Sequence, residues 1–240
     1  MTAREDKEKM NVDQWPNLAT MFFEQAATYR EQPFLWKKRD GVYESLTWSD
    51  ANARAIALAR GLLSLGVQSG DRIVLVSENR PAWPIADIAI MAAGGITTPA
   101  YTTNTPADHR HVLTDSGARG AIVSTTKLAE KVLSGTDGLD HVEFVIVMED
   151  LPKHSGGPKV LRMADILETG QARHENVYKM AEQIDRSDTA CIIYTSGTGG
   201  TPKGVMLSHG SILHNCAGAV DALRDLKLER EIFLSFLPLS

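Results

Sequence analysis

Cysteine and excess positive charge are both scarce in this sequence, and each scarcity argues against a class of protein. Cys191 and Cys216 are the two cysteines among 240 residues. Two thiols do not make a disulfide framework. We therefore expect both cysteines to occupy ordinary core positions in a protein from a reducing compartment. The formal net charge is −5, whereas a protein that binds nucleic acid usually carries a basic patch. We therefore expect a cytoplasmic protein with no nucleic-acid partner.

Long apolar segments are also missing. The longest apolar run, residues 85–96, contains Asp87 and two glycines, and it is shorter than the ~20 residues that span a bilayer. The N-terminal stretch MTAREDKEKM is charged and lacks the apolar region of a signal peptide. We expect no transmembrane segment, and we leave open a peripheral contact with a membrane and a homodimer.

Strand and helix patterns alternate along most of the chain. Short apolar and β-branched runs predict strands, and helix signals lie between most of them. This alternation predicts an α/β fold with a largely parallel sheet flanked by helices. Strands are expected near residues 72–77, 96–100, 121–124, 143–148, 189–194, 205–207 and 232–237. Helices are expected near residues 17–29, 47–65, 81–94, 105–116, 125–133, 161–169 and 210–223.

Local signals mark where some of these elements begin and end. The dipeptide Asp40-Gly41 lies between two alternating runs and predicts a β-hairpin. The pattern Thr47-x-x-Asp50 predicts a capping box at a helix start, and Gly66 predicts the end of that helix. Residues 151–159, LPKHSGGPK, are expected to form a surface loop.

The chain is expected to divide into three regions. Residues 1–16 are expected to be a disordered or frayed N-terminus. Residues 17–186 are expected to form an N-terminal α/β subdomain. Residues 187–240 are expected to be the start of a second α/β subdomain, which carries the glycine-rich loop described next.

A glycine-rich loop follows the apolar strand expected at residues 189–194. Residues 194–204 read YTSGTGGTPKG, and glycines let backbone N–H groups approach a ligand closely and form a concave anion site. Lys203 adds a positive charge. This donor array suits a polyphosphate, and we infer a nucleoside triphosphate. A flexible surface linker is the alternative, but a linker gives no reason for the apolar strand before the loop or the Pro-Lys-Gly exit. The hydroxyl groups of the loop belong to Thr195, Ser196, Thr198 and Thr201.

Other phosphate, metal and nucleophile motifs are absent. The loop is not a Walker A motif, because Pro202 precedes Lys203 and Gly204 follows it. His109 and His111 are two residues apart on a helix and do not share a face, so a paired metal site is not expected. Four further residues have spacings that fit no standard zinc pattern, and we expect them in the core or in turns. They are His209, His214, Cys191 and Cys216. For His209 the alternative is a hydrogen bond near the loop.

The loop and its surroundings resemble a known family. Residues 194–209, YTSGTGGTPKGVMLSH, closely resemble the phosphate-loop signature of the adenylate-forming superfamily, whose usual form is [Y/F]TSGTTGxPKGV. Residues 46–79 and 236–240 look like further motifs of these enzymes in the expected order. Residues 91–119 resemble long-chain acyl-CoA synthetases in particular. The resemblance therefore implies the N-terminal portion of the large domain of an acyl-CoA synthetase-like fold.

The resemblance implies a two-step reaction. A carboxylate, in the long-chain fatty acid class, attacks the α-phosphorus of ATP and gives an acyl-adenylate and pyrophosphate. Coenzyme A then displaces AMP and forms a thioester, and the family uses Mg²⁺ with the ATP. By matching, the phosphates would be held by Thr195, Ser196, Gly197, Thr198, Gly199, Gly200, Thr201 and Lys203, and Thr195 would also touch the metal.

Two departures from the family pattern set limits on this interpretation. Gly199 stands where the family usually has Thr, which removes one hydroxyl from the loop. The segments that carry the catalytic lysine and the rest of the nucleotide pocket in the family do not occur in these 240 residues, so no catalytic residue is assigned. We expect the 240 residues alone to be inactive. A non-catalytic nucleotide-binding or interaction module is the alternative.

Overall fold

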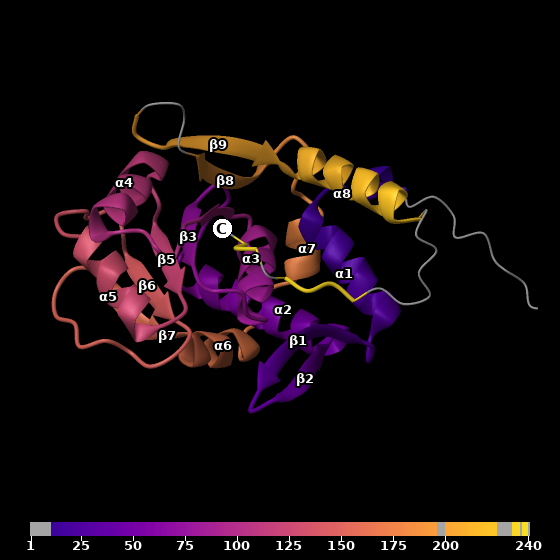
Figure 1. Cartoon of the computed structure of the whole chain (residues 1–240), viewed down its shortest axis with the longest axis horizontal. Coiled ribbons are helices and arrows are strands. Elements are labelled where there is room, and N and C mark those ends of the chain that lie inside the picture. Colours follow the sequence, from indigo (N-terminus) through magenta and orange to yellow (C-terminus); the bar gives the residue numbers. More distant parts are fainter. Residues whose placement is uncertain (1–10, 196–199, 225–231, 236, 240) are drawn as a thin grey trace, which may run out of the picture.

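The fold is an α/β sandwich built on a seven-stranded, mainly parallel sheet, as the sequence predicts (Figure 1). The computed structural model describes residues 11–195, 200–224, 232–235 and 237–239. The strand order is β7-β6-β5-β3-β4-β8-β9, and within this sheet only the β8–β9 pair is antiparallel. The strands are β3 (Arg72–Val76), β4 (Ile96–Pro99), β5 (Gly120–Val123), β6 (Phe144–Val147), β7 (Lys159–Arg162), β8 (Thr189–Thr195) and β9 (Lys203–Ser208).

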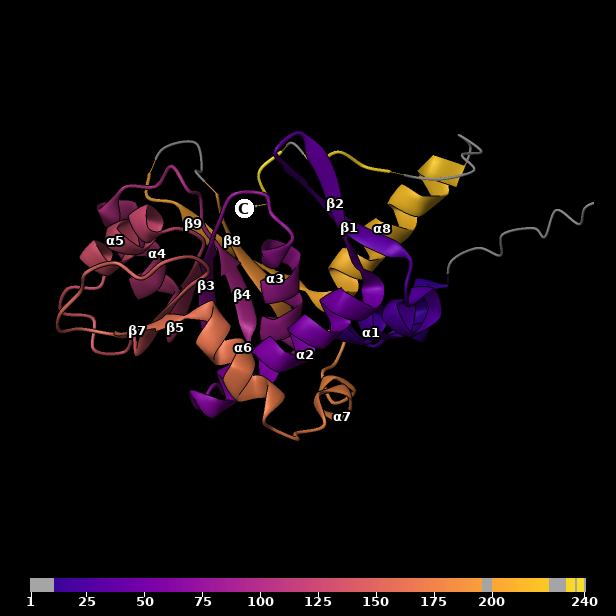
Figure 2. The same ribbon diagram turned by 90° about the horizontal axis from the view of Figure 1, so that it is seen from below.

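Two layers of helices cover the two faces of this sheet (Figures 1 and 2). Neighbouring residues of a strand point to opposite faces, so Ile73 of β3 joins the core under one layer and Val74 joins the core under the other. The larger core is built with α1 (Leu18–Tyr29), α2 (Trp48–Ser64), α3 (Ala82–Ala92), α6 (Met163–Gln171), α7 (Val177–Ala181) and α8 (His209–Arg224). The smaller core is built with α4 (Pro106–Ser116) and α5 (Thr126–Gly135).

The expected hairpin is present and stands apart from the main sheet. Strands β1 (Pro33–Arg39) and β2 (Val42–Thr47) form a two-stranded antiparallel sheet. Asp40 and Gly41 connect them with φ angles of 48° and 84°. Two successive positive φ angles identify the tight primed turn that matches the twist of a hairpin, so this prediction is confirmed.

Both expected ends of α2 are also confirmed. The Thr47 hydroxyl accepts a hydrogen bond from the Asp50 N–H at 3.0 Å, and the Asp50 carboxylate accepts one from the Thr47 N–H at 3.1 Å. At the other end Gly66 has a φ of 84°. The Gly66 and Val67 N–H groups donate back to the carbonyls of Leu63 and Leu62, the pattern of a Schellman motif.

The structure differs from the expectations at four places. Two short helices, Val12–Gln14 and α7, lie where the sequence predicts no helix, and two stretches differ in strand assignment. The short edge strand β7 begins within the stretch expected to be a loop, and α6 follows it directly. β7 is partly exposed, with the charged residues Lys159 and Arg162 at its ends, so it lacks the apolar run by which a strand is recognised. Residues 232–235 and 237 are not in a strand, contrary to the expected strand at 232–237; no described strand pairs with them.

The segment after residue 187 extends the same sheet as the segment before it. β8 lies parallel to β4, with Thr97 opposite Cys191. The division into two subdomains at residue 187 stays a prediction. Within residues 11–16 the structure differs from a frayed terminus, because Val12 and Trp15 are buried; residues 1–10 lie outside the described part. Among the described helices, none is both long and apolar enough to cross a membrane.

Candidate functional site

The glycine-rich loop connects β8 to β9 at the edge of the sheet where the parallel strands end. β8 runs parallel to β4, so Thr195 at its end lies on the carboxyl edge, where α/β folds place ligands. Thr195 lies directly opposite Lys203 of β9. Four of the residues predicted to bind phosphate lie outside the described part of the chain: Ser196, Gly197, Thr198 and Gly199. The other four, Thr195, Gly200, Thr201 and Lys203, are exposed.

The loop exit requires a glycine because of the residues packed against it. A Cβ atom on Gly204 would lie 2.7 Å from Cγ2 of Ile192 and 3.2 Å from Cζ of Tyr194. The first distance is too short for a van der Waals contact, and the second is a tight one. Gly204 therefore lets β9 approach the side chains of β8 closely, just after Lys203.

Helix α4 holds this hairpin in place by three contacts. The Tyr194 hydroxyl donates a hydrogen bond of 2.7 Å to the Asp115 carboxylate. Nε2 of His111 lies 2.8 Å from the Pro202 carbonyl oxygen; since a carbonyl can only accept, His111 donates here. The His111 ring also meets the Tyr194 ring edge-on, with centroids 5.7 Å apart. The two ends of the loop are thus fixed to one rigid helix.

The hydrogen bond of Tyr194 depends on a protonated hydroxyl. Burial raises the pKa of Tyr194, and the neighbouring Asp115 carboxylate raises it further. The phenol therefore stays a donor over the physiological pH range. The sequence motif did not identify His111 or Asp115, because α4 precedes the loop by about 80 to 90 residues and only the folded chain brings them together.

Lys203 supplies a positive charge at the end of the hairpin. Among the described residues it makes no salt bridge, whereas several arginines of the chain do. Two hydroxyls (Thr195, Thr201), backbone amides and one ammonium group form a donor set that fits the oxygens of a triphosphate. No group of three His, Cys, Asp or Glu side chains gathers to hold a metal ion in the described part of the chain. Thr195 as a metal ligand stays a prediction.

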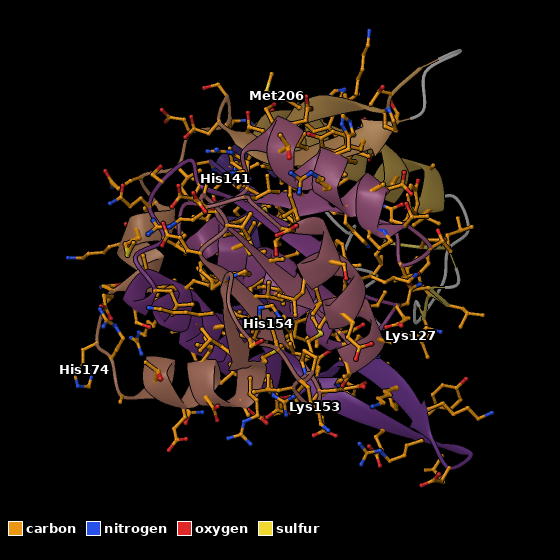
Figure 3. The ribbon with its side chains drawn as sticks, turned by 90° about the vertical axis from the view of Figure 1, so that its left-hand side faces the viewer. Lys127, His141, Lys153, His154, His174 and Met206 are labelled. Atoms are coloured by element: carbon orange, nitrogen blue, oxygen red, sulfur yellow. The ribbon has the colours of Figure 1, made fainter. Side chains whose placement is uncertain are left out.

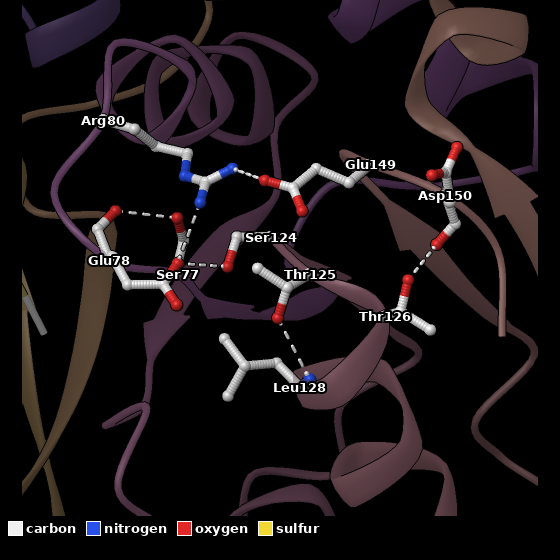
Figure 4. Close-up of polar contacts among 9 residues, drawn as sticks. All are labelled: Ser77, Glu78, Arg80, Ser124, Thr125, Thr126, Leu128, Glu149 and Asp150. Carbon is white, nitrogen blue, oxygen red and sulfur yellow. Dashed lines mark hydrogen bonds and ion pairs between the residues drawn. The ribbon is translucent and has the colours of Figure 1, made fainter. Parts of the chain in front are cut away.

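A second polar cluster lies at the same edge, between β3 and β5, but its groups are already paired (Figure 4). Arg80 binds Glu149 at 2.8 Å and Glu78 at 3.1 Å. The Ser124 hydroxyl donates to Glu78 at 2.5 Å. Burial alone would raise the pKa of Glu78, but the hydrogen bonds from Ser124 and Arg80 outweigh it and the pKa is lowered. This cluster is a satisfied ion-pair network that ties three strand ends together.

Of the two histidines expected in the core or in turns, His209 is buried, whereas His214 is exposed on α8, so the expectation is wrong for His214. His209 is 1% exposed, and its Nδ1 accepts a hydrogen bond of 3.3 Å from the Leu18 N–H, far from the loop. His109 is fully buried on α4, and neither of its ring nitrogens has a partner among the described residues. Burial lowers the pKa of His109 and of His209 to about 4.

Because the pKa values of these two histidines are lowered, we expect the free energy of unfolding to decrease in mild acid. A pKa lowered in the folded state contributes stability that is fully present above the unfolded pKa of about 6.5 and is lost as the pH falls towards 4. Each histidine accounts for roughly 3 kcal/mol of this loss. Asp87 opposes it, because burial raises its pKa to about 6 and its contribution to stability grows as the pH falls from 6. We expect a net decrease in the free energy of unfolding from pH 6.5 to 4, measured by urea titration.

A matched pair of variants identifies the source of this pH dependence. His109→Leu should flatten the profile by about half of the histidine effect, since it removes one of the two buried imidazoles. His174 is exposed on the surface (Figure 3), so His174→Leu should leave the profile unchanged. A His109→Leu protein with the same slope as the parent would contradict the assignment.

Comparison with known proteins identifies the family. The sequence matches the family described as AMP-binding enzyme over residues 22–240. It is 34% identical over 231 residues to the long-chain-fatty-acid–CoA ligase FadD15 of Mycobacterium tuberculosis, which covers 95% of this chain and 37% of that protein. It is 30% identical over 223 residues to the long-chain-fatty-acid–CoA ligase ACSBG1 of Rattus norvegicus, which covers 92% and 31%.

The solved structures agree with the sequence comparison. A protein from Rhodopseudomonas palustris CGA009 superimposes with a TM-score of 0.70 at 26% identity, over 93% of this chain and 51% of that one. A benzoate CoA ligase from Burkholderia xenovorans LB400 superimposes with a TM-score of 0.64, also at 26% identity, over 81% and 35%. This chain thus spans about a third of the length of the curated relatives it matches. With the family match over nearly all of its residues, the chain belongs to the AMP-binding enzyme family.

Proposed function

We propose that this chain is the N-terminal part of a cytoplasmic ligase that activates a long-chain fatty acid with ATP and transfers the acyl group to coenzyme A. The observation that supports this most is the β8–β9 hairpin, whose end presents Thr195, Thr201 and Lys203 to solvent. The acid class rests on the relatives, two of which are named as long-chain-fatty-acid–CoA ligases.

The chain's own residues would bind and orient the triphosphate. The Lys203 ammonium and the Thr195 and Thr201 hydroxyls would hold the β- and γ-phosphates, so that the α-phosphorus faces the attacking carboxylate. A carboxylate is already an anion, so this step needs positioning and charge neutralisation rather than a general base. Mg²⁺, when bound, would supply further positive charge, with Thr195 as its proposed ligand.

His111 and Asp115 would act as positioning residues in this scheme. Neither presents a group to the phosphates; they fix the carbonyl of Pro202 and the hydroxyl of Tyr194. The loop would then keep its shape when the triphosphate binds, and less conformational entropy would be lost on binding.

The proposal is tested by measuring pyrophosphate release from the longer protein that contains this chain, with and without a fatty acid substrate. We expect release of pyrophosphate when ATP, Mg²⁺ and a long-chain fatty acid are present, and release of AMP with repeated turnover only when coenzyme A is added as well. Both should be slower with short acids. Release that does not depend on an acid would contradict the proposal. We expect no turnover from the 240 residues alone, and a burst of pyrophosphate from them would overturn that part.

A non-catalytic nucleotide-binding or interaction module is the second candidate, and Gly199 favours it. Glycine at this position lacks the hydroxyl of the usual threonine, which removes one donor from the loop. The longer protein would then bind ATP, and calorimetry would detect that binding, but it would form no acyl-adenylate. A stable complex with another protein, formed without nucleotide, would favour an interaction role.

A further inference from the structure

A single side chain, Asn79, anchors the C-terminal segment of the chain, and the proposed phosphate site does not use it. Its Nδ2 group donates hydrogen bonds to the carbonyl oxygens of Ser235 at 2.9 Å and Leu237 at 2.7 Å. The same group donates to the Ser235 hydroxyl at 3.1 Å. The Oδ1 atom accepts a hydrogen bond from the Leu239 N–H at 3.3 Å. The carboxamide thus uses both its donors and its acceptor on one segment.

These contacts stand in for the strand partner that the segment lacks. Ser235, Leu237 and Leu239 alternate along the chain, and no described strand pairs with them. Among residues 232–235 and 237–239, all the hydrogen bonds that join described residues involve Asn79. Leu234 and Leu237 are 78% and 66% exposed, so packing holds them only weakly. The path of the segment therefore depends largely on this one side chain.

The ion-pair network at the ends of β3, β5 and β6 fixes the backbone on both sides of Asn79 (Figure 4). Arg80, the residue after it, binds Glu149 beyond the end of β6. Glu78, the residue before it, binds Arg80 and accepts a hydrogen bond from Ser124 at the end of β5. The carboxamide is therefore presented from a rigid base, and less backbone entropy is lost when it binds the segment.

The anchor lies at the same edge of the sheet as the proposed phosphate site. Asn79 follows the carboxyl end of β3, and Thr195 ends β8. β4 lies between these two strands and is parallel to both, so their ends are about 10 Å apart across the sheet. Figures 1 and 2 show the yellow end of the segment beside α3, the helix that follows β3. An acid whose carboxylate meets the α-phosphorus of ATP could extend towards it.

We propose that Asn79 is a positioning residue for the acid substrate, an inference that rests on the proposed function. Asn79 would hold Leu237 and Leu239 beside the phosphate site. Both leucines are exposed, and burying them against the hydrocarbon part of the acid would be favourable. Asn79 itself would contact neither the acid nor ATP. Loss of the anchor should therefore weaken binding of the acid and leave binding of ATP unchanged.

Steady-state kinetics of the longer protein test this role. Each hydrogen bond of the anchor is worth roughly two- to tenfold in an equilibrium constant. We therefore expect Asn79→Ala to raise KM for a long-chain acid about tenfold. KM for ATP and kcat at saturating acid should stay the same. Asn79→Asp keeps the shape of the side chain but has no N–H donor, and its carboxylate would repel the carbonyls of Ser235 and Leu237. Its effect on KM for the acid should be at least as large.

An NMR measurement on the 240-residue chain tests the anchor without turnover. Asn79→Ala should move the amide resonances of Ser235, Leu237 and Leu239 towards random-coil positions, because the segment loses its fixed partner. The thermal midpoint should not change, since Asn79 is exposed. Asn215→Ala is the matched control, because Asn215 is exposed on α8; it should change neither these resonances nor KM for the acid.

The two measurements distinguish failure of this inference from failure of the proposed function. Unchanged resonances at Ser235, Leu237 and Leu239 in Asn79→Ala would overturn the anchor. In an active parent protein, an unchanged KM for the acid, or a KM for ATP that rises equally, would overturn the positioning role. A parent protein without acid-dependent release of pyrophosphate would contradict the proposed function and, with it, the positioning role. The resonances would then still decide whether Asn79 anchors the segment.

Discussion

Gly170→Ala is expected to destabilise the protein by at least ~3 kcal/mol and to lower the thermal midpoint by roughly 10 °C. Gly170 lies where α6 crosses α2, and a methyl group there would overlap the backbone carbonyl of Ala57 and lie 2.9 Å from the Gly61 nitrogen. Backbone atoms on two packed helices cannot move aside as a flexible side chain can. Differential scanning calorimetry measures the change directly.

Gly218→Ala is the matched control for this prediction. Gly218 lies in α8, and a Cβ atom there would meet nothing within 4 Å. Alanine forms helix better than glycine by about 1 kcal/mol, so the same substitution should stabilise the protein slightly. If Gly170→Ala melted at the same temperature as the parent, the close crossing of α2 and α6 would be wrong.

Lys203→Ala is expected to lower kcat/KM for ATP by roughly a hundredfold in the longer protein that contains this chain. The ammonium group has no other ion-pair partner in the described residues, so its proposed role is to neutralise the triphosphate. Initial rates of pyrophosphate release at varied ATP concentration measure the loss. Lys203→Arg should retain much of the activity, because it keeps the charge in a different geometry.

A control variant distinguishes the loss of a direct phosphate contact from the loss of one positive charge on the protein surface. Lys127→Ala removes one exposed lysine at the start of α5, the helix after β5, and two strands, β3 and β4, separate β5 from β8. This variant should leave kcat/KM for ATP unchanged. Equal effects of Lys203→Ala and Lys127→Ala would point to long-range electrostatics rather than a phosphate contact.

Much of the fold could be predicted from the sequence, because local patterns matched the final packing. The buried strand β6 is an uninterrupted apolar run, Phe144–Val147, and Asp40-Gly41 permits only a few turn types. The capping box is a local hydrogen-bond pattern that two residues three positions apart, Thr47 and Asp50, determine. In each case the information lies within a few neighbouring residues.

The misses occur where a partner from elsewhere in the chain decides the structure. β7 is a strand because β6 pairs with it, from Phe144 opposite Lys159 to Val147 opposite Arg162. Residues 232–235 have an apolar pattern but no described strand beside them; instead, Asn79 donates hydrogen bonds to the carbonyls of Ser235 and Leu237. Hydrophobic periodicity cannot distinguish these outcomes.

The candidate site shows the same division. The sequence motif identified the donors of the loop, because glycines, hydroxyls and a lysine are recognisable as a set. It did not identify the supports of the loop on α4, His111 and Asp115, since their contacts with Pro202 and Tyr194 join distant parts of the chain. Positioning residues of this kind carry no local signature.

The central claim is that the end of the β8–β9 hairpin binds a triphosphate. An NMR titration of the 240-residue chain with inorganic triphosphate and Mg²⁺ tests it most directly, because it requires no adenine pocket and no turnover. We predict that the largest amide shift changes fall at Thr195, Thr201, Lys203 and Gly204 and that Lys203→Ala abolishes them. Shift changes centred on the Arg80 and Glu149 network, or none at the hairpin at saturating triphosphate, would contradict the account.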